Sequence, residues 1–215
     1  TLLAVIMGNP KYQVTSGSIT LDGEDVLEMK VDERAKKGLF LAMQYPSEVS
    51  GVVNAEFLKA AINSKRETPI KLFEFYRQLE SASKKVNIPM EMANRFLNEG
   101  FSGGEKKRNE ILQLLLLKPD FAMLDEIDSG LDVDAINVVA NAIKELEQTD
   151  MSFLVVSHYA RLYQLIHPTR AVIMINGRIA LDGDTSLIKR IDEEGYEWIK
   201  KEYGIEINKE EAVMN

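Results

Sequence analysis

The hydrophobic residues of this chain form short continuous runs and longer stretches with helical spacing. Residues 38–43, 121–124 and 152–156 are mostly apolar and do not alternate with polar residues, which is typical of strands covered on both faces. Residues 133–148 place apolar side chains at the spacing of an amphipathic helix. This order of strand, helix and strand predicts an α/β fold with a parallel sheet and helices on both faces.

A helical block interrupts the strand-bearing regions. Helices are expected at residues 55–64, 70–82 and 90–97, and a further helix runs to Leu117. Because strands are expected on both sides of the block, we interpret it as an inserted helical subdomain. We divide the chain into residues 1–44 (part of a ligand-binding core), residues 45–117 (the helical subdomain) and residues 118–215 (the remaining core and a C-terminal helical extension).

The two ends of the chain give weaker patterns. The further elements expected are a helix at 1–8, a strand and turn at 17–23, a helix at 160–166, strands at 171–175 and 178–181, and charged helical sequence from Ser186 onward. Asn176-Gly177 between the last two strands is a hairpin signal.

Composition excludes several kinds of function. The net charge of −8 gives no basic surface for nucleic acid. The sequence has no cysteine, which removes disulfides and thiolate-bound clusters from these residues, and two histidines make a zinc site a poor expectation. No apolar run is long enough for a membrane span and no secretion signal is visible, so a cytoplasmic protein without membrane insertion is expected.

A glycine-rich helix start is the first candidate for binding chemistry. Ser102 followed by Glu105 predicts a capping box at the start of a helix. Gly103 and Gly104 between them are not needed for a cap, and glycine disfavours a helix by about 1 kcal/mol relative to alanine. Backbone without Cβ lets another molecule approach, and a helix N-terminus favours an anion such as phosphate. Considered alone, an ordinary glycine-rich helix start is the better explanation of these four residues.

Two acids at a strand end are the second candidate. Asp125 and Glu126 follow an uncharged apolar run, and ligands of open α/β sheets bind beyond the carboxyl ends of the strands. One acid there can hold Mg²⁺ while the other orients or activates water for attack on a phosphate. A solvated strand end before a helix cap is the alternative.

The order of these motifs resembles that of the ATP-binding-cassette (ABC) ATPases over nearly the whole chain. The glycine-rich start, the acidic strand end, Ser129-Gly-Leu-Asp132 and Ser157-His158 come in the same order as in that family. Longer segments resemble the SufC-type members, the ATPases of iron–sulfur cluster assembly. These segments are residues 6–12, 40–46, 54–58, 98–113 and 124–132.

The resemblance implies a P-loop NTPase fold with a RecA-like core, and it implies a role for each motif. Asp125 would be the Mg²⁺ residue of Walker B and Glu126 the catalytic base, with Gln44 as the Q-loop glutamine near Mg²⁺ and the attacking water. His158 would be the histidine that contacts the terminal phosphate. The remaining binding residues would be Ser102, Gly103, Gly104 and Glu105 of the signature, and Ser129 and Asp132 of the D-loop.

The chain departs from the family in one respect. The phosphate-binding loop G-x-x-x-x-G-K-[ST] is absent, because no Gly-Lys dipeptide occurs in the sequence. Residues 1–3 and the helix after them resemble the segment on the C-terminal side of that loop in the family. We therefore expect the native polypeptide to carry roughly 35 to 40 further N-terminal residues that include the first strand and the loop.

The resemblance implies ATP and Mg²⁺ as cofactors and a transient, ATP-dependent homodimer in which two subunits pack head to tail. The function it implies is ATP hydrolysis that drives iron–sulfur cluster assembly on a SufB–SufD-type scaffold. The alternatives are the nucleotide-binding subunit of a membrane transporter and a catalytically dead binding module. We further hypothesise that Lys107 pairs with Glu126 in the resting monomer and restrains it until dimerisation.

Overall fold

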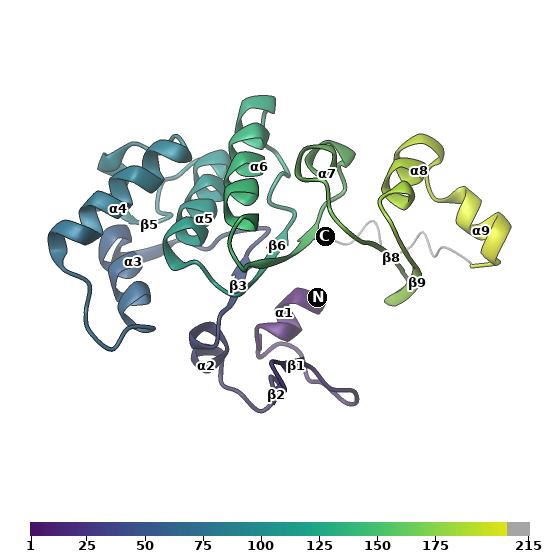
Figure 1. Cartoon of the computed structure of the whole chain (residues 1–215), viewed down its shortest axis with the longest axis horizontal. Helices are drawn as coiled ribbons and strands as arrows, with labels where there is room; N and C mark the ends of the chain where they lie inside the picture. The colour runs from purple at the N-terminus through teal and green to yellow at the C-terminus, as the bar shows by residue number, and fades with distance from the viewer. Residues whose placement is uncertain (206–215) are drawn as a thin grey trace. The chain divides into compact units, whose positions relative to one another are not determined.

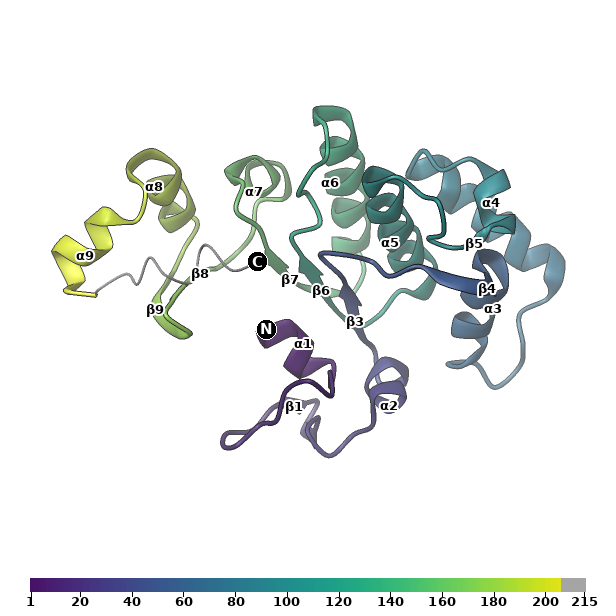
Figure 2. The same cartoon turned by 180° about the vertical axis from the view of Figure 1, so that it is seen from behind.

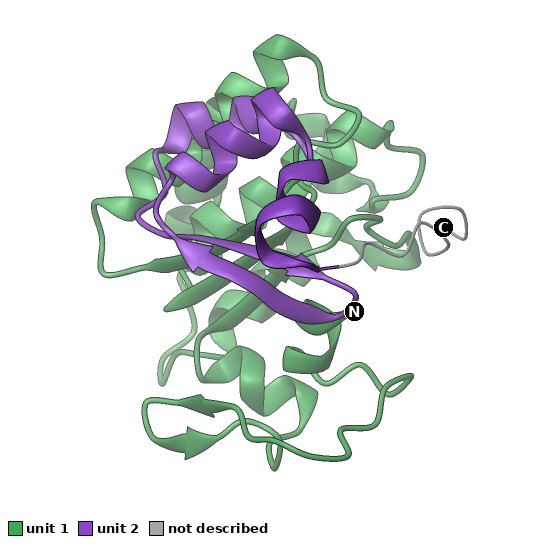
Figure 3. Ribbon diagram, turned by 90° about the vertical axis from the view of Figure 1, so that its right-hand side faces the viewer, with its two compact units in different colours: residues 1–157 green, residues 158–215 purple. Residues whose placement is uncertain are grey.

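The structure of this protein is a computed structural model that describes residues 1–205. The chain divides into two compact units, residues 1–157 and the part from His158 onward, which are coloured separately in Figure 3. The division into three parts expected from the sequence stays a prediction.

A parallel sheet of three strands forms the centre of the first unit (Figure 2). The strands β3 (Leu39–Ala42), β6 (Phe121–Asp125) and β7 (Ser152–Val156) lie in the order β3-β6-β7. Strand β6 lies between the other two, and its residues Ala122, Met123 and Leu124 are fully buried. Burial on both faces explains why β6 carries a continuous apolar run. The expected strands are confirmed, and their parallel pairing brings their carboxyl ends to one edge.

Helices pack around this sheet and against one another. The longest are α4 (Leu72–Lys85), α5 (Gly103–Leu117) and α6 (Val133–Glu147), and α5 contacts α4, α6 and the shorter α3 (Asn54–Asn63) (Figure 1). The apolar stripe predicted for α6 is buried at Ile136, Val139, Ala140, Ile143 and Leu146. Burial of these faces stabilises α5 and α6 beyond what helix propensity supplies.

The prediction of a helix at residues 90–97 is wrong. The segment forms a short 3-10 helix, η1 (Met90–Asn94), and then a strand, β5 (Phe96–Leu97). Strand β5 pairs antiparallel with β4 (Val49–Val53), which the sequence analysis did not anticipate. Pairing between segments distant in sequence therefore overrides the local helical pattern.

The N-terminal part contains α1 (Leu2–Ile6), α2 (Val31–Lys36) and a hairpin of β1 (Thr20–Leu21) and β2 (Glu24–Asp25). The buried Arg34 of α2 connects this helix to α1, because its Nη1 donates to the carbonyl oxygens of Val5 (3.0 Å) and Ile6 (2.8 Å) at the end of α1. A cation at a helix C-terminus is stabilised by the partial negative charge of the carbonyls there.

The second unit contains the antiparallel hairpin of β8 (Ala171–Ile175) and β9 (Arg178–Gly183), as Asn176-Gly177 predicted. Both turn residues have positive φ, +52° and +72°, as a tight hairpin turn requires. The helices of this unit are α7 (Ala160–Ile166), α8 (Ser186–Glu194) and α9 (Glu197–Tyr203). The helical sequence expected after Ser186 is confirmed for α8 and α9, and its last part, residues 206–215, lies outside the described residues.

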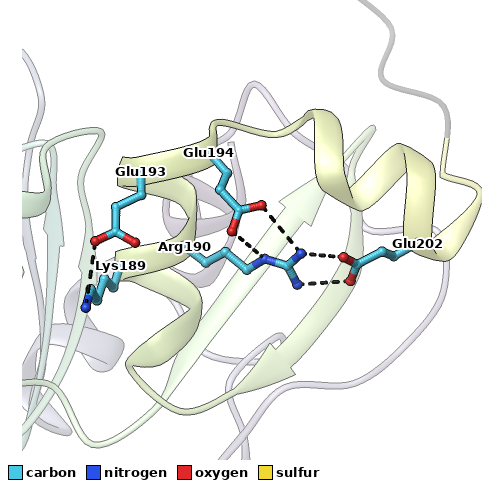
Figure 4. Close-up of polar contacts among 5 residues, drawn as sticks. All are labelled: Lys189, Arg190, Glu193, Glu194 and Glu202. Carbon is cyan, nitrogen blue, oxygen red and sulfur yellow. Dashed lines mark hydrogen bonds and ion pairs between the residues drawn. The ribbon is translucent and has the colours of Figure 1, made fainter.

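Arg190 joins α8 to α9 in the second unit (Figure 4). Its guanidinium binds the Glu202 carboxylate with two hydrogen bonds, contacts Glu194 at 3.1 Å and lies 3.8 Å from the centre of the Trp198 ring. Trp198 itself is buried with Ile175 and Ile199. A two-point contact and ring stacking fix the guanidinium better than a single surface ion pair would.

None of the helices in the described part of the chain is both long and apolar enough to cross a membrane.

Candidate active site

The carboxyl ends of β3 and β6 bring together the residues expected for phosphate chemistry. Asp125 is the last residue of β6, Glu126 follows it, and Gln44 lies two residues beyond the end of the neighbouring β3. The Gln44 amide donates to the Glu126 carboxylate, with 2.6 Å between Nε2 and Oε2. The two residues are 82 positions apart in the sequence, so this contact is produced by the parallel pairing of the strands.

The backbone of Glu126 adopts an uncommon conformation. Its φ is +47°, in the left-handed region that residues with a Cβ rarely occupy. Its N–H nevertheless donates to the carbonyl of Val156 at 2.9 Å, which extends the bonding of β6 to β7 by one residue. Neighbouring strands thus hold Glu126 in a conformation that costs about 1 to 2 kcal/mol.

The capping box predicted at the start of α5 is confirmed. Ser102 Oγ accepts from the N–H of Glu105 at 3.3 Å, and the Glu105 carboxylate accepts from the N–H of Ser102 at 2.7 Å. The hydrogen bond from the Ser102 main chain lowers the pKa of Glu105 and keeps it ionised. We use the name signature helix for α5 because this cap opens it.

The fold of this chain gives no reason for the two glycines in the cap. Neither Gly103 nor Gly104 has a positive φ. A Cβ on Gly103 would meet no atom within 4 Å, and a Cβ on Gly104 would make ordinary contacts with Arg108 and Leu131 at 3.6 and 3.7 Å. The subunit thus has room for a Cβ at both positions, and its own packing does not require the glycines. Backbone without a Cβ would allow close approach by another molecule.

The segment after Glu126 turns into α6. The N–H of Ser129 donates to the Glu126 carbonyl at 3.1 Å, and Asp132 caps α6 by accepting from the N–H of Ala135 at 2.8 Å. Asp128, which the sequence analysis missed, is buried and accepts from the Ser157 hydroxyl at 2.6 Å. Burial raises the pKa of Asp128.

His158 lies two residues beyond the end of β7 in sequence and is the first residue of the second unit. Within that unit it borders an open hollow together with Arg161, Gln164 and Asp192. Its expected role at a terminal phosphate stays a prediction.

Comparisons with known proteins agree with this arrangement. A family model described as ABC transporter matches residues 1–129. The chain belongs to the ABC ATPase family. ABC ATPases hydrolyse ATP, so the predicted enzyme class is confirmed at the level of the family.

Two relatives and one solved structure illustrate the similarity. "Vegetative protein 296" of Bacillus subtilis (strain 168) is 56% identical over 208 residues, which are 96% of this chain and 80% of the relative. "Probable ATP-dependent transporter SufC" of Escherichia coli (strain K12) is 40% identical over 206 residues, which are 94% of this chain and 83% of the relative. The dimeric post-hydrolysis structure of the ATP-binding cassette MJ0796, bound to ADP and Pi, superimposes with a TM-score of 0.72 at 18% identity over 85% of this chain and 78% of that one. The predicted ABC-ATPase fold is therefore confirmed.

The donors of this ABC ATPase suit magnesium and a nucleotide. Asp125 supplies a carboxylate and Gln44 an amide oxygen, and Mg²⁺ prefers oxygen ligands and retains several waters. One carboxylate oxygen of the buried Asp128 has no hydrogen-bond partner among the described residues. This set fits a hydrated cation bound mainly through phosphates, which would supply charge neutralisation to the reaction.

Lys107 of the ABC ATPase contacts the main chain of the site. Its Nζ lies 2.9 Å from the carbonyl oxygen of Glu126 and 3.4 Å from that of Met43, and the side chain is buried. Burial lowers the pKa of Lys107, while Glu110 and Glu126 act in the opposite direction. The contact of Lys107 is thus with the main-chain carbonyl of Glu126, whereas the Glu126 carboxylate accepts from Gln44. The hypothesised restraint on Glu126 stays a prediction.

Replacing Lys107 by Ala is expected to raise the basal ATPase rate of the isolated subunit. The change frees the main chain at Glu126 and leaves two carbonyls without this donor, at a cost of about 1 to 3 kcal/mol in stability. Lys84→Ala is the control, because it also removes a lysine side chain, but Lys84 pairs with Glu80 on α4, at 2.7 Å. The measurement is steady-state phosphate release. A rate for Lys107→Ala below that of the wild type, or the same rate for both variants, would contradict the restraint.

Glu110 is a buried acid on the signature helix that sequence reasoning missed. Its Oε2 accepts from the N–H of Met43 at 3.1 Å and its Oε1 accepts from the Gln113 amide at 3.1 Å. Burial raises the pKa of Glu110 to about 7, although these hydrogen bonds and the cation of Lys107 partly oppose the shift.

The raised pKa predicts a stability that falls as pH rises. Between the unfolded value of 4.5 and about 7 the folded state binds more protons than the unfolded state, so the free energy of unfolding decreases through this range. The full loss is about 3 kcal/mol. Urea unfolding at about pH 5 and about pH 8 should show the decrease in the wild type and a smaller one in Glu110→Gln, and equal pH dependence in both would contradict the assignment.

Proposed function

We propose that this ABC ATPase drives iron–sulfur cluster assembly on a SufB–SufD-type scaffold. The observation that carries the proposal is the 40% identity to a protein named SufC across 94% of this chain. The sequence contains no cysteine, so within these residues no thiolate can hold a cluster, and the cluster ligands are assigned to the partner.

In this proposal each site residue has one role. Glu126 is the base that activates water. Gln44 positions the Glu126 carboxylate and, together with Asp125, also faces Mg²⁺. His158 contacts the terminal phosphate of the nucleotide. Two further groups act across a transient ATP-dependent homodimer: the signature residues Ser102, Gly103, Gly104 and Glu105, and the D-loop residues Ser129 and Asp132. The capping of α6 by Asp132 supports a fixed D-loop backbone.

Exposed aromatic side chains support a docking surface for the partner on the first unit. Phe73 at the start of α4 is 81% exposed and Tyr45, next to Gln44, is 80% exposed. Large apolar side chains left in water are typical of protein–protein contacts, in which aromatic residues are enriched. A partner bound at Tyr45 would act directly beside the residue that holds Glu126.

A pull-down of the full-length protein from its native cells tests the proposal. The expected result is co-purification with soluble SufB- and SufD-like proteins and with iron. Phe73→Ser should reduce recovery of the partner, whereas Val133→Ser, an exposed apolar residue on α6, should not. Recovery of the same partner at the same level with both variants would contradict the docking surface.

The second candidate is the nucleotide-binding subunit of a membrane transporter. It is favoured by the family model, whose description is ABC transporter, and the relative's printed name also includes the word transporter. Recovery of an integral membrane protein in the same pull-down, without iron, would favour this candidate over the first. A catalytically dead binding module is the third candidate, and the ATPase rate of Glu126→Gln separates it from both.

A further inference from the structure

The signature helix holds the residues that precede and follow Gln44 at several points. We call residues 43–48 the Gln44 segment. Both polar main-chain groups of Met43 are bound by α5: its N–H donates to Glu110 at 3.1 Å, and its carbonyl lies 3.4 Å from Lys107 Nζ. At the other end of the segment, Glu48 pairs with Lys106. The residue directly before Gln44 is thus fixed to the helix that begins at the signature.

Buried asparagines provide a second connection to the same segment. Asn109 of α5 donates to Asn98 at 2.9 Å, and Asn98 donates to the carbonyl of Ser47 at 3.0 Å. Asn54, at the start of α3, donates to Asn109 at 3.1 Å. All three asparagines are almost fully buried, so these hydrogen bonds form away from water, where leaving a polar group unpaired is costly.

Glu110 is an unfavourable residue for packing alone. It is 6% exposed, while its neighbours Ile111 and Leu114 on the same helix are fully buried apolar residues. A buried carboxylate is costly, and an apolar side chain would fill the position at lower cost. What the carboxylate adds is an acceptor for the N–H of Met43.

We propose that Glu110 is a positioning residue that holds Gln44 against the Glu126 carboxylate. The contacts run from Glu110 to the N–H of Met43, through one peptide unit to Gln44, and from its amide to Glu126 at 2.6 Å. Glu110 acts through Gln44 and touches no reacting atom. The proposal rests on the functions proposed above for Gln44 and Glu126.

Two conservative variants of Glu110 separate the effect of its side-chain length from the effect of its charge. Glu110→Asp keeps the charge but shortens the side chain by one methylene, so the carboxylate no longer reaches the N–H of Met43. Glu110→Gln loses the charge but keeps an amide oxygen for that N–H, and its NH₂ group can donate to a flipped Gln113 amide. A positioning role predicts that Asp slows the enzyme and Gln does not, whereas a role for the charge predicts the reverse.

The experiment measures kcat and KM for ATP in the full-length protein with its partner. Glu110→Asp is expected to lower kcat by about tenfold with little change in KM, since misplaced catalytic groups lower the rate without changing uniform binding. Glu110→Gln should stay within about twofold of the wild type. Ile62→Val in α3, a change in the buried core outside the Gln44 segment, controls for a general loss of stability.

A double variant shows whether the effect passes through Gln44. Gln44→Ala should lower kcat by itself, and Glu110→Asp should add nothing in that background. Two results would overturn the positioning role of Glu110 and leave the proposed function of Gln44 intact. One is that the two substitutions lower kcat independently, so that their effects multiply. The other is that Glu110→Asp keeps the wild-type kcat while Gln44→Ala is slow. A wild-type kcat for Gln44→Ala would overturn the proposed function of Gln44 and this inference together.

Discussion

Replacing Glu126 by Gln is expected to lower the ATPase rate of the full-length protein by about 10² to 10⁴-fold. The change removes the carboxylate that would accept a proton from the attacking water while keeping the shape of the side chain. Its amide oxygen can still accept from Gln44, so the contact seen at 2.6 Å is retained. ATP binding should therefore persist, and the expected signature is tight nucleotide binding with slow phosphate release.

Glu80→Gln is the control for this measurement. Glu80 lies on the exposed face of α4, where it pairs with Lys84 at 2.7 Å, and it should leave the rate unchanged. Equal rates for the wild type and Glu126→Gln would show that Glu126 is not the catalytic base and would favour the dead binding module. A rate that falls together with ATP affinity would indicate a role for Glu126 in binding instead.

Replacing Gly103 by Leu is expected to lower the ATPase rate by about 10²-fold while the subunit stays folded. The site of the new Cβ is open in the subunit, because a Cβ at Gly103 would meet no atom within 4 Å. The leucine side chain would occupy the space through which a second copy brings its nucleotide to the amides of the signature. Thermal unfolding should be little changed, because leucine is favoured over glycine in a helix.

The matched control is Glu56→Leu, which adds an exposed leucine to the first turn of α3. Both variants gain one apolar side chain, but only Gly103→Leu should lose ATP-dependent dimers in size-exclusion chromatography. Normal dimerisation and a normal rate for Gly103→Leu would show that the glycines serve no contact between copies.

The sequence predicted the sheet better than the small strands. The buried strand β6 and the helix α6 follow from patterns that burial itself imposes, one continuous and one periodic. The strands β4 and β5 could not be found this way, because β5 has only two residues and its pairing partner lies far upstream. Local sequence at residues 90–97 favours a helix, and the tertiary pairing decides against it.

The residues of the candidate site also differ in how far the sequence reveals them. Gln44, Asp125 and Glu126 are marked by their place at strand ends, where parallel topology brings side chains together. Glu110 carries no such mark, because its partner is a main-chain N–H whose position depends on how α5 packs beside β3. One signal was available: Glu110 and Gln113 are polar residues three positions apart beside the apolar run of that helix, and a polar pair in such a place requires partners.

The left-handed backbone at Glu126 has a consequence for the evolution and engineering of this protein. Glycine would relieve the strain at φ +47°, so a selection for thermostability alone would favour replacing this side chain. Stability therefore favours glycine at position 126, whereas turnover requires glutamate. Stabilised versions of the enzyme should be designed without substitutions at this position.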